Sequence, residues 1–274
     1  MRWRWASGLT RVMSLHTHSD PVVGTLVIDR RLYGPRRSAN GGFAAGSISR
    51  SVDADVVTVR LHKPVPLGRG MNVVATDDGG IRVVDGARTI ASAYPGTLAD
   101  ADPPPAPSYR DAVLARAAHP LAGMRHPLSD CFVCGPHRPD GMHVTPGFAP
   151  DRADMLVAPW VVGADVSGSG IAHLAAVWGA IDCTSYPAHA LRTGELCLLG
   201  TMTALVERRP RVGEKLVVYS WTRSHERRRY ETSAVMVDAD GAVVARADAT
   251  WIAVRHQRLH ALRVRRRPAP RVSY

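Results

Sequence analysis

The sequence contains little cysteine and no long hydrophobic run. Its four cysteines, at positions 131, 134, 183 and 197 of 274 residues, are too few for the disulfide framework of a small secreted protein. No apolar run approaches the roughly 20 residues that span a bilayer. The basic start, Met1–Trp5, precedes no apolar stretch of signal-peptide length. These absences predict a globular protein of the reducing cytoplasm with no transmembrane segment.

Several common catalytic motifs are also missing. No Gly-x-Ser-x-Gly sequence is present, which excludes the nucleophile elbow of many serine hydrolases. Neither a Walker loop nor a Gly-x-Gly-x-x-Gly fingerprint occurs, so the usual nucleotide-binding and dinucleotide-binding loops are excluded. Any reaction must therefore depend on other residues.

Positive charge is concentrated at the two ends of the chain. The formal net charge is +11, and residues 255–274 contribute +7 through seven arginines with no acid. Residues 1–20 contribute +2, which leaves only +2 for residues 21–254. Such a tail is usually solvated, but it can bind an anionic ligand or surface weakly. Since no nucleic-acid module is recognisable, we expect no specific nucleic-acid partner.

One structural theme occurs twice, because each half has a glycine-containing turn, a small-residue helix and a run of alternating strands. An internal repeat of this kind fixes an architecture before any residue has a role. In the first half we expect a strand at Val22–Ile28, a helix at Phe43–Arg50 after the Ser38–Gly42 turn, and strands at Val57–Leu61, Met71–Ala75, Ile81–Val84 and Thr89–Tyr94. In the second we expect a strand at Asp154–Val161, a helix from Ile171 after the Ser167–Gly170 turn, and strands at Leu196–Val206, Leu216–Arg223, Arg229–Val237 and Ala242–Val254.

Both halves predict an α+β layer in which a helix packs on a curved antiparallel sheet. In the second half an apolar stripe at helical spacing supports this packing; it consists of Ile171, Leu174, Ala175, Trp178 and Ile181. The chain then divides into five regions. We expect a disordered basic N-terminus at 1–20, an N-terminal unit at 21–96, a Pro-rich connector with a short helix (Tyr109–Ala118) at 97–150, a C-terminal unit at 151–254 and an Arg-rich tail at 255–274.

A family resemblance rests on the first helix start, the second helix and the paired Pro/Gly strand ends. These segments are Asn40–Phe43, Trp178–Asp182, Lys63–Gly68 and Arg209–Gly213. With them, the chain resembles double hotdog proteins of the acyl-CoA thioesterase class over residues 21–254. The resemblance implies two tandem hotdog units, each a long helix wrapped by an antiparallel sheet.

The resemblance also implies catalytic residues. In thioesterase II type enzymes an Asp on the second helix, a Thr on the next strand and a Gln on the last strand orient the attacking water. Asp182 matches the Asp, and the Thr falls at or beside Thr201. The Gln position falls near Ala249 and Thr250, so this chain has no Gln there.

Asp182 is a carboxylate in an otherwise apolar helix. Counted from Ile171 it lies on the side that faces the sheet, and it opposes the helix dipole near the C-terminal end. Burial would raise its pKa toward the range of a general base. We expect Asp182 to activate water. The alternative is a structural carboxylate that is satisfied by backbone amides or by an arginine of the other unit.

The Asn40-Gly41-Gly42 turn is the candidate site for the substrate carbonyl. Free N–H groups at a helix start can polarise a thioester carbonyl and stabilise the oxyanion. The alternative is that Asn40 is an N-cap and the glycines permit tight packing. In hotdog pairs the site lies at the junction of the two units, so the resemblance places this turn near Asp182.

Four further residues are weaker candidates. Thr201 would position the water, although a lone Thr on a strand is more often a simple β-former. Ser169 and His173 flank the second turn and are candidates for contact with the substrate. Trp178, on the same helix as Asp182, is a further candidate.

Cys131 and Cys134 form a Cys-x-x-Cys pair followed by His137 and His143. These residue types suit zinc, but one such pair is a weak signal for a metal or a redox centre. The neighbouring glycines and prolines of residues 135–141 favour a tight turn. We therefore expect structural packing, with no metal and no cofactor.

Together these features predict a hydrolase of lipid metabolism that cleaves an acyl-CoA or acyl carrier thioester with a water activated by Asp182. The missing Gln motivates a second hypothesis, a non-catalytic protein that binds acyl-CoA or a lipid-like ligand. A hotdog dehydratase is a third, which is disfavoured because no Asp is followed five positions later by His. Since such units often pair further in the resembling families, a homodimer is the candidate assembly.

Overall fold

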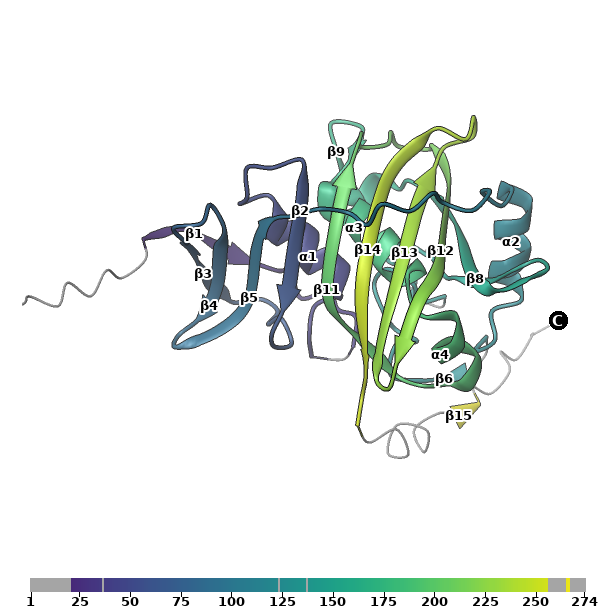
Figure 1. Cartoon of the computed structure of the whole chain (residues 1–274), viewed down its shortest axis with the longest axis horizontal. Helices are drawn as coiled ribbons and strands as arrows, with labels where there is room; N and C mark the ends of the chain where they lie inside the picture. The colour runs from purple at the N-terminus through teal and green to yellow at the C-terminus, as the bar shows by residue number, and fades with distance from the viewer. Residues whose placement is uncertain (1–20, 36, 123, 137, 256–264, 267–274) are drawn as a thin grey trace, which may run out of the picture.

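A computed structural model describes residues 21–255, apart from 36, 123 and 137, together with 265 and 266 (Figure 1). The predictions for residues 1–20 and for nearly all of the Arg-rich tail lie outside these residues. The strands are β1 (Val22–Val27), β2 (Val56–Leu61), β3 (Gly70–Ala75), β4 (Ile81–Asp85), β5 (Arg88–Pro95), β6 (Met124–Arg125), β7 (Gly147–Ala149), β8 (Arg152–Val161), β9 (Ser167–Gly168), β10 (Ile171–Ala172), β11 (Cys197–Val206), β12 (Lys215–Glu226), β13 (Arg229–Val237), β14 (Val243–Ala253) and β15 (Arg265–Arg266). The helices are α1 (Gly41–Ser49), α2 (Tyr109–Ala117), α3 (Leu174–Thr184) and α4 (Ala188–Thr193), with a 3-10 turn at Ala164–Val166.

One antiparallel sheet of eleven strands runs through both halves of the chain, in the order β1-β3-β4-β5-β2-β11-β14-β13-β12-β8-β7. In each half the strand before the helix lies far from the centre, and the strand after the helix lies at the centre. The first half has the order β1-β3-β4-β5-β2 from the edge to the centre. Read in the same direction, toward the centre, the second half has the corresponding order β8-β12-β13-β14-β11, with β7 outside β8. The two halves of the chain thus have the same strand topology, which is the form that the internal repeat expected from the sequence takes.

The two halves join where β2 pairs with β11. Met202 lies opposite Val59, and Thr203 lies opposite Thr58. Met202 and Val59 are fully buried on the side of the helices, whereas the hydroxyl groups of Thr58 and Thr203 lie 2.8 Å apart. Because side chains alternate along a strand, the two threonines lie on the outer face of the sheet.

Helices α1 and α3 pack against each other and against the inner face of the sheet, as Figure 1 shows. Gly46 of α1 lies so close to α3 that an added Cβ would be 2.6 Å from Cβ of Trp178. Residues 175–184 of α3 are all buried. The helix is therefore buried on more sides than the expected apolar stripe, because α1 covers the side that does not face the sheet.

The second helix begins three residues later than expected. Ile171 pairs with Gly168 in the small β9–β10 hairpin, and it also forms a bridge to Arg211. Ser169 and Gly170 both have positive φ, 53° and 77°, which suits a two-residue hairpin turn. His173 is the N-cap, so the prediction that Ile171 starts the helix is wrong.

The Pro-rich connector crosses the outer face of the sheet in front of β14, β13 and β12 and leads to α2 (Figure 1). Asp248 accepts a hydrogen bond from Ala99 N at 2.6 Å, and the Tyr219 hydroxyl donates to Pro104 O at 3.1 Å. The chain then returns to the inner side, where the ring of Phe132 packs edge-on against Phe43 at 5.7 Å. This return places the Cys131–Cys134 turn beside the start of α1. Within the described residues, no helix is long and apolar enough to span a membrane.

Candidate active site at the junction of the two units

Asp182 lies in the last turn of α3, directly against the start of α1. The residue is 2% exposed, and a Cβ on Gly42 would be only 2.1 Å from its Cβ. Gly42 and Gly46 are four residues apart, on one face of α1. Because these glycines have no side chain, the two helices can approach closely. This is the alternative packing role expected for Gly42 from the sequence.

One oxygen of the Asp182 carboxylate is bound by the first unit. Its Oδ2 accepts hydrogen bonds from Gly42 N at 2.9 Å and from Asn40 Nδ2 at 3.2 Å. Asn40 is also the N-cap of α1, because its Oδ1 accepts from Phe43 N at 2.8 Å. This bond fixes the orientation of the amide, so its NH₂ group faces Asp182. The structure therefore brings together the two parts of the site that the sequence predicts separately.

The other oxygen, Oδ1, is buried and has no hydrogen-bond partner among the described residues. An unsatisfied buried acceptor is costly, so Oδ1 is available to accept a hydrogen bond from a molecule in the site. Burial raises the pKa of Asp182 to about 7, against the opposing effect of the Gly42 N–H and Asn40. A carboxyl group with a pKa near neutrality can accept and return a proton under ordinary conditions.

The first turn of α1 leaves one backbone donor unused. The Gly42 N–H is bound to Asp182, the Phe43 N–H to Asn40 Oδ1, and the Ala44 N–H to Asn40 O. For the Gly41 N–H the described residues provide no partner, and Gly41 lines the cavity beside Asp182. Of the two glycine N–H groups, only that of Gly41 is therefore available as a candidate donor to an oxyanion, because that of Gly42 is bound to Asp182.

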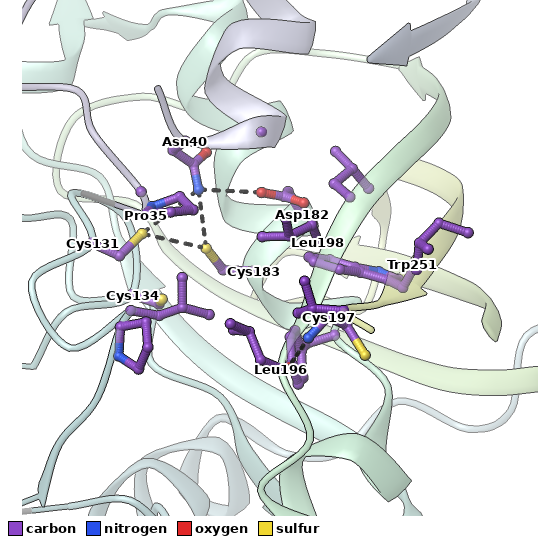
Figure 2. Close-up of a pocket in the computed structure, with 18 of the residues that line it drawn as sticks. Pro35, Asn40, Cys131, Cys134, Asp182, Cys183, Leu196, Cys197, Leu198 and Trp251 are labelled. Atoms are coloured by element: carbon purple, nitrogen blue, oxygen red, sulfur yellow. Dashed lines mark hydrogen bonds between the residues drawn. The ribbon is translucent and has the colours of Figure 1, made fainter. Parts of the chain in front are cut away.

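Three cysteines lie beside this carboxylate. Asn40 Nδ2 lies 3.4 Å from Cys183 Sγ and 3.6 Å from Cys131 Sγ, and Figure 2 shows Asn40 between the Asp182 carboxylate and these two sulfurs. Thiol donors at Cys134 and Cys183 lower the pKa of Cys131, and the same contacts raise the pKa of the two donors. The Cys-x-x-Cys pair was visible in the sequence, but the proximity of Cys183 was not.

A cavity of about 650 Å³ opens beside these groups (Figure 2). Asn40, Gly41, Asp182 and the three cysteines form part of its wall. Much of the remaining wall is apolar and includes Leu61, Leu191, Leu196, Leu198, Leu199 and Trp251. Three cationic side chains also contribute, those of Arg37, Lys63 and Arg228. The cavity can therefore hold a ligand that has both an apolar part and an anionic part.

Five of the candidate residues do not line this cavity. Gly42 is buried between the helices, where its N–H is bound to Asp182. Thr201 lies opposite Arg60 in the β2–β11 pairing and shares the outer face with Thr203, on the side of the sheet away from Asp182. Ser169 is exposed at the tip of the β9–β10 hairpin, and His173 is exposed at the start of α3. Trp178 is buried against Gly46 in the helix interface.

The fold is that of a double hotdog protein, with two helices packed together on one antiparallel sheet. Solved structures with this fold match 79–86% of this chain at low identity. A protein named as a thioesterase II from Thermobifida fusca is 18% identical, with a TM-score of 0.53, covering 85% of this chain and 94% of that one. A hot dog fold protein of unknown function from Alicyclobacillus acidocaldarius is 12% identical, with a TM-score of 0.51 and coverage of 84% and 92%. An acyl-CoA thioesterase II from Mycobacterium marinum is 15% identical, with a TM-score of 0.50 and coverage of 79% and 90%.

These similarities confirm the α+β double hotdog fold expected from the sequence. At such identities they establish the fold and leave the reaction to the chemistry of the site. No protein-family model matches the chain, and no curated protein is significantly similar to it in sequence.

Proposed function

We propose that this chain hydrolyses an acyl thioester, of coenzyme A or of an acyl carrier, with Asp182 as the general base. The observation that carries the proposal is the buried, unpartnered Oδ1 of Asp182 at the junction of the two units. A water that donates a hydrogen bond to Oδ1 would satisfy this acceptor and would be placed for deprotonation. The hydrogen bonds to Oδ2 hold the carboxylate in one orientation.

Each step of the reaction has a group on this chain. Asp182 Oδ1 takes a proton from the water, whose oxygen attacks the thioester carbonyl carbon. The negative charge that forms on the carbonyl oxygen is stabilised by the unused Gly41 N–H, near the positive end of α1. When the C=O bond re-forms, the C–S bond breaks, and the leaving thiolate takes the proton back from Asp182. The products are a carboxylic acid and a free thiol.

The cavity fits both ends of such a substrate. The acyl chain would lie against the leucines and Trp251, where burial of apolar surface stabilises binding by about 25 cal/mol per Å². The phosphates of the carrier would meet the cations contributed by Arg37, Lys63 and Arg228, since such groups form charge-assisted bonds with phosphate.

A second candidate function is the binding of an acyl ligand without turnover. It is favoured by the absence of a Gln near Ala249 and Thr250 and by the position of Thr201 on the outer face, which leaves the water with fewer orienting groups. A dehydratase remains the least supported alternative.

The test measures thiol release and binding for short, medium and long acyl-CoAs. The parent and Asp182→Asn are compared with Asp154→Asn, which changes an exposed carboxylate of β8. We expect turnover by the parent and by Asp154→Asn, with a clear chain-length optimum set by the cavity. Binding without turnover in the parent would overturn the hydrolase proposal and support the ligand-binding alternative.

A further inference from the structure

Cys131, Cys134 and Cys183 form a compact sulfur cluster that the proposed hydrolysis does not use. Their sulfur atoms all lie within 4.8 Å of one another, and those of Cys131 and Cys183 are 4.0 Å apart. Cys131 and Cys183 are buried, and Cys134 is partly buried. All three line the cavity, so a small ion has a route to them.

The spacing of the sulfurs fits a metal better than a disulfide. In tetrahedral zinc thiolates the Zn–S distance of about 2.3 Å separates neighbouring sulfurs by about 3.8 Å. A disulfide would bring two sulfurs to about 2.05 Å. The 4.0 Å between Cys131 and Cys183 is close to the first value, and the third sulfur lies near enough to complete one face of a tetrahedron.

A side-chain amide of the first unit lies against two of the sulfurs. Asn40 Nδ2 donates to both Cys131 Sγ and Cys183 Sγ, at 3.6 and 3.4 Å. Donors of this kind stabilise thiolates and form the outer shell of metal sites. The turn that carries Cys131 and Cys134 is tight, since a Cβ on Gly135 would lie 2.5 Å from Cys131 O.

We propose that Cys131, Cys134 and Cys183 bind one zinc ion, with a fourth position open to the cavity. Three protein ligands and one exchangeable position, filled by water, are a common zinc arrangement. The sequence suggests His137 and His143 as partners of the Cys-x-x-Cys pair. The structure instead supplies Cys183 from the other unit, while His137 lies outside the described residues. The ion would tie the connector turn to α3 across 52 residues of chain.

The experiment measures metal binding to the full-length protein under anaerobic conditions. The protein is stripped with a chelator and titrated with Zn²⁺ against a chromophoric competitor, and with Co²⁺ as a spectroscopic probe. We expect one Zn²⁺ per chain and a cobalt spectrum with sulfur-to-metal charge transfer from three thiolates. Cys131→Ser, Cys134→Ser and Cys183→Ser should each weaken zinc binding by about 100-fold or more, since loss of an outer-shell partner alone costs 10–100-fold.

Cys197→Ser is the matched control, because Cys197 is also buried and also lines the cavity but lies outside the cluster. It should keep the stoichiometry, the affinity and the cobalt spectrum of the parent. Cys134 is the most exposed of the three ligands, so Cys134→Ser is the variant least expected to misfold. Circular dichroism checks that each variant is folded. Absence of stoichiometric zinc in the parent, or parent-like affinity in folded Cys134→Ser and Cys183→Ser, would overturn the proposal. Neither result depends on hydrolase activity.

Discussion

Replacing Gly42 by alanine should disrupt the contact between the two central helices. An added Cβ would lie 2.1 Å from Asp182 Cβ and 2.7 Å from the backbone oxygen of Trp178, so α1 and α3 must move apart. Overpacking of this kind costs about 1–3 kcal/mol. Loss of the hydrogen bond from Gly42 N to the carboxylate costs about 1.5–3 kcal/mol more. The better helix propensity of alanine offsets about 1 kcal/mol, which leaves a net destabilisation of about 1.5–5 kcal/mol.

Thermal unfolding followed by circular dichroism measures this effect. At about 2–4 °C per kcal/mol for a chain of this size, the Tm of Gly42→Ala should fall by at least about 3 °C. Gly24→Ala is the control, because a Cβ at Gly24 in β1 meets nothing within 4 Å. We expect no loss of stability there. If Gly42→Ala unfolds at the same temperature as Gly24→Ala, the helices do not meet as closely as described.

Three further predictions concern single side chains. Asn40→Ala removes the N-cap of α1 and a donor to Asp182. Denaturant unfolding should show a loss of at least about 1 kcal/mol in the free energy of unfolding, and thiol release should be reduced. Unchanged stability and activity would contradict both roles. Thr201→Val should keep thiol release within about twofold of the parent, because Thr201 lies on the outer face; a large loss would favour the role implied by the resemblance. Burial lowers the pKa of His119, so the folded state favours the neutral ring and loses stability as the pH falls through the unfolded value of about 6.5. His119→Gln lacks this pH-dependent contribution. In urea unfolding, its free energy of unfolding should therefore fall less between pH 8 and pH 5 than that of the parent. An equal fall would count against the buried neutral ring.

The repeat could be predicted from the sequence because its signals are local. Alternating strands, Pro/Gly strand ends and the turn before each helix are short-range patterns, and they locate the main strands within three residues. The second helix start was missed because Ile171 is held in a hairpin and bridged to Arg211. A contact across 40 residues therefore overrides the helical spacing of the apolar stripe.

The site was only partly predictable for a similar reason. Asp182 and Asn40 stand out as polar residues in apolar or glycine-rich surroundings, and the resemblance gave their proximity. The face of Thr201 depends on strand register, where a shift of one residue reverses every side chain, and the pairing is irregular between Leu199 and Thr201. Cys183 gave no sequence signal of its own, because its neighbours in the cluster come from the distant connector turn.

The most direct test of the central claim is the turnover of Asp182→Asn. The substitution keeps the size of the side chain but removes the base. With the acyl-CoA that the parent cleaves best, kcat should fall by about 10²-fold or more, the range expected for loss of a general base, while ligand binding and the Tm stay close to those of the parent. If folded Asp182→Asn releases thiol at the rate of the parent, Asp182 is not the base and the proposed mechanism is wrong.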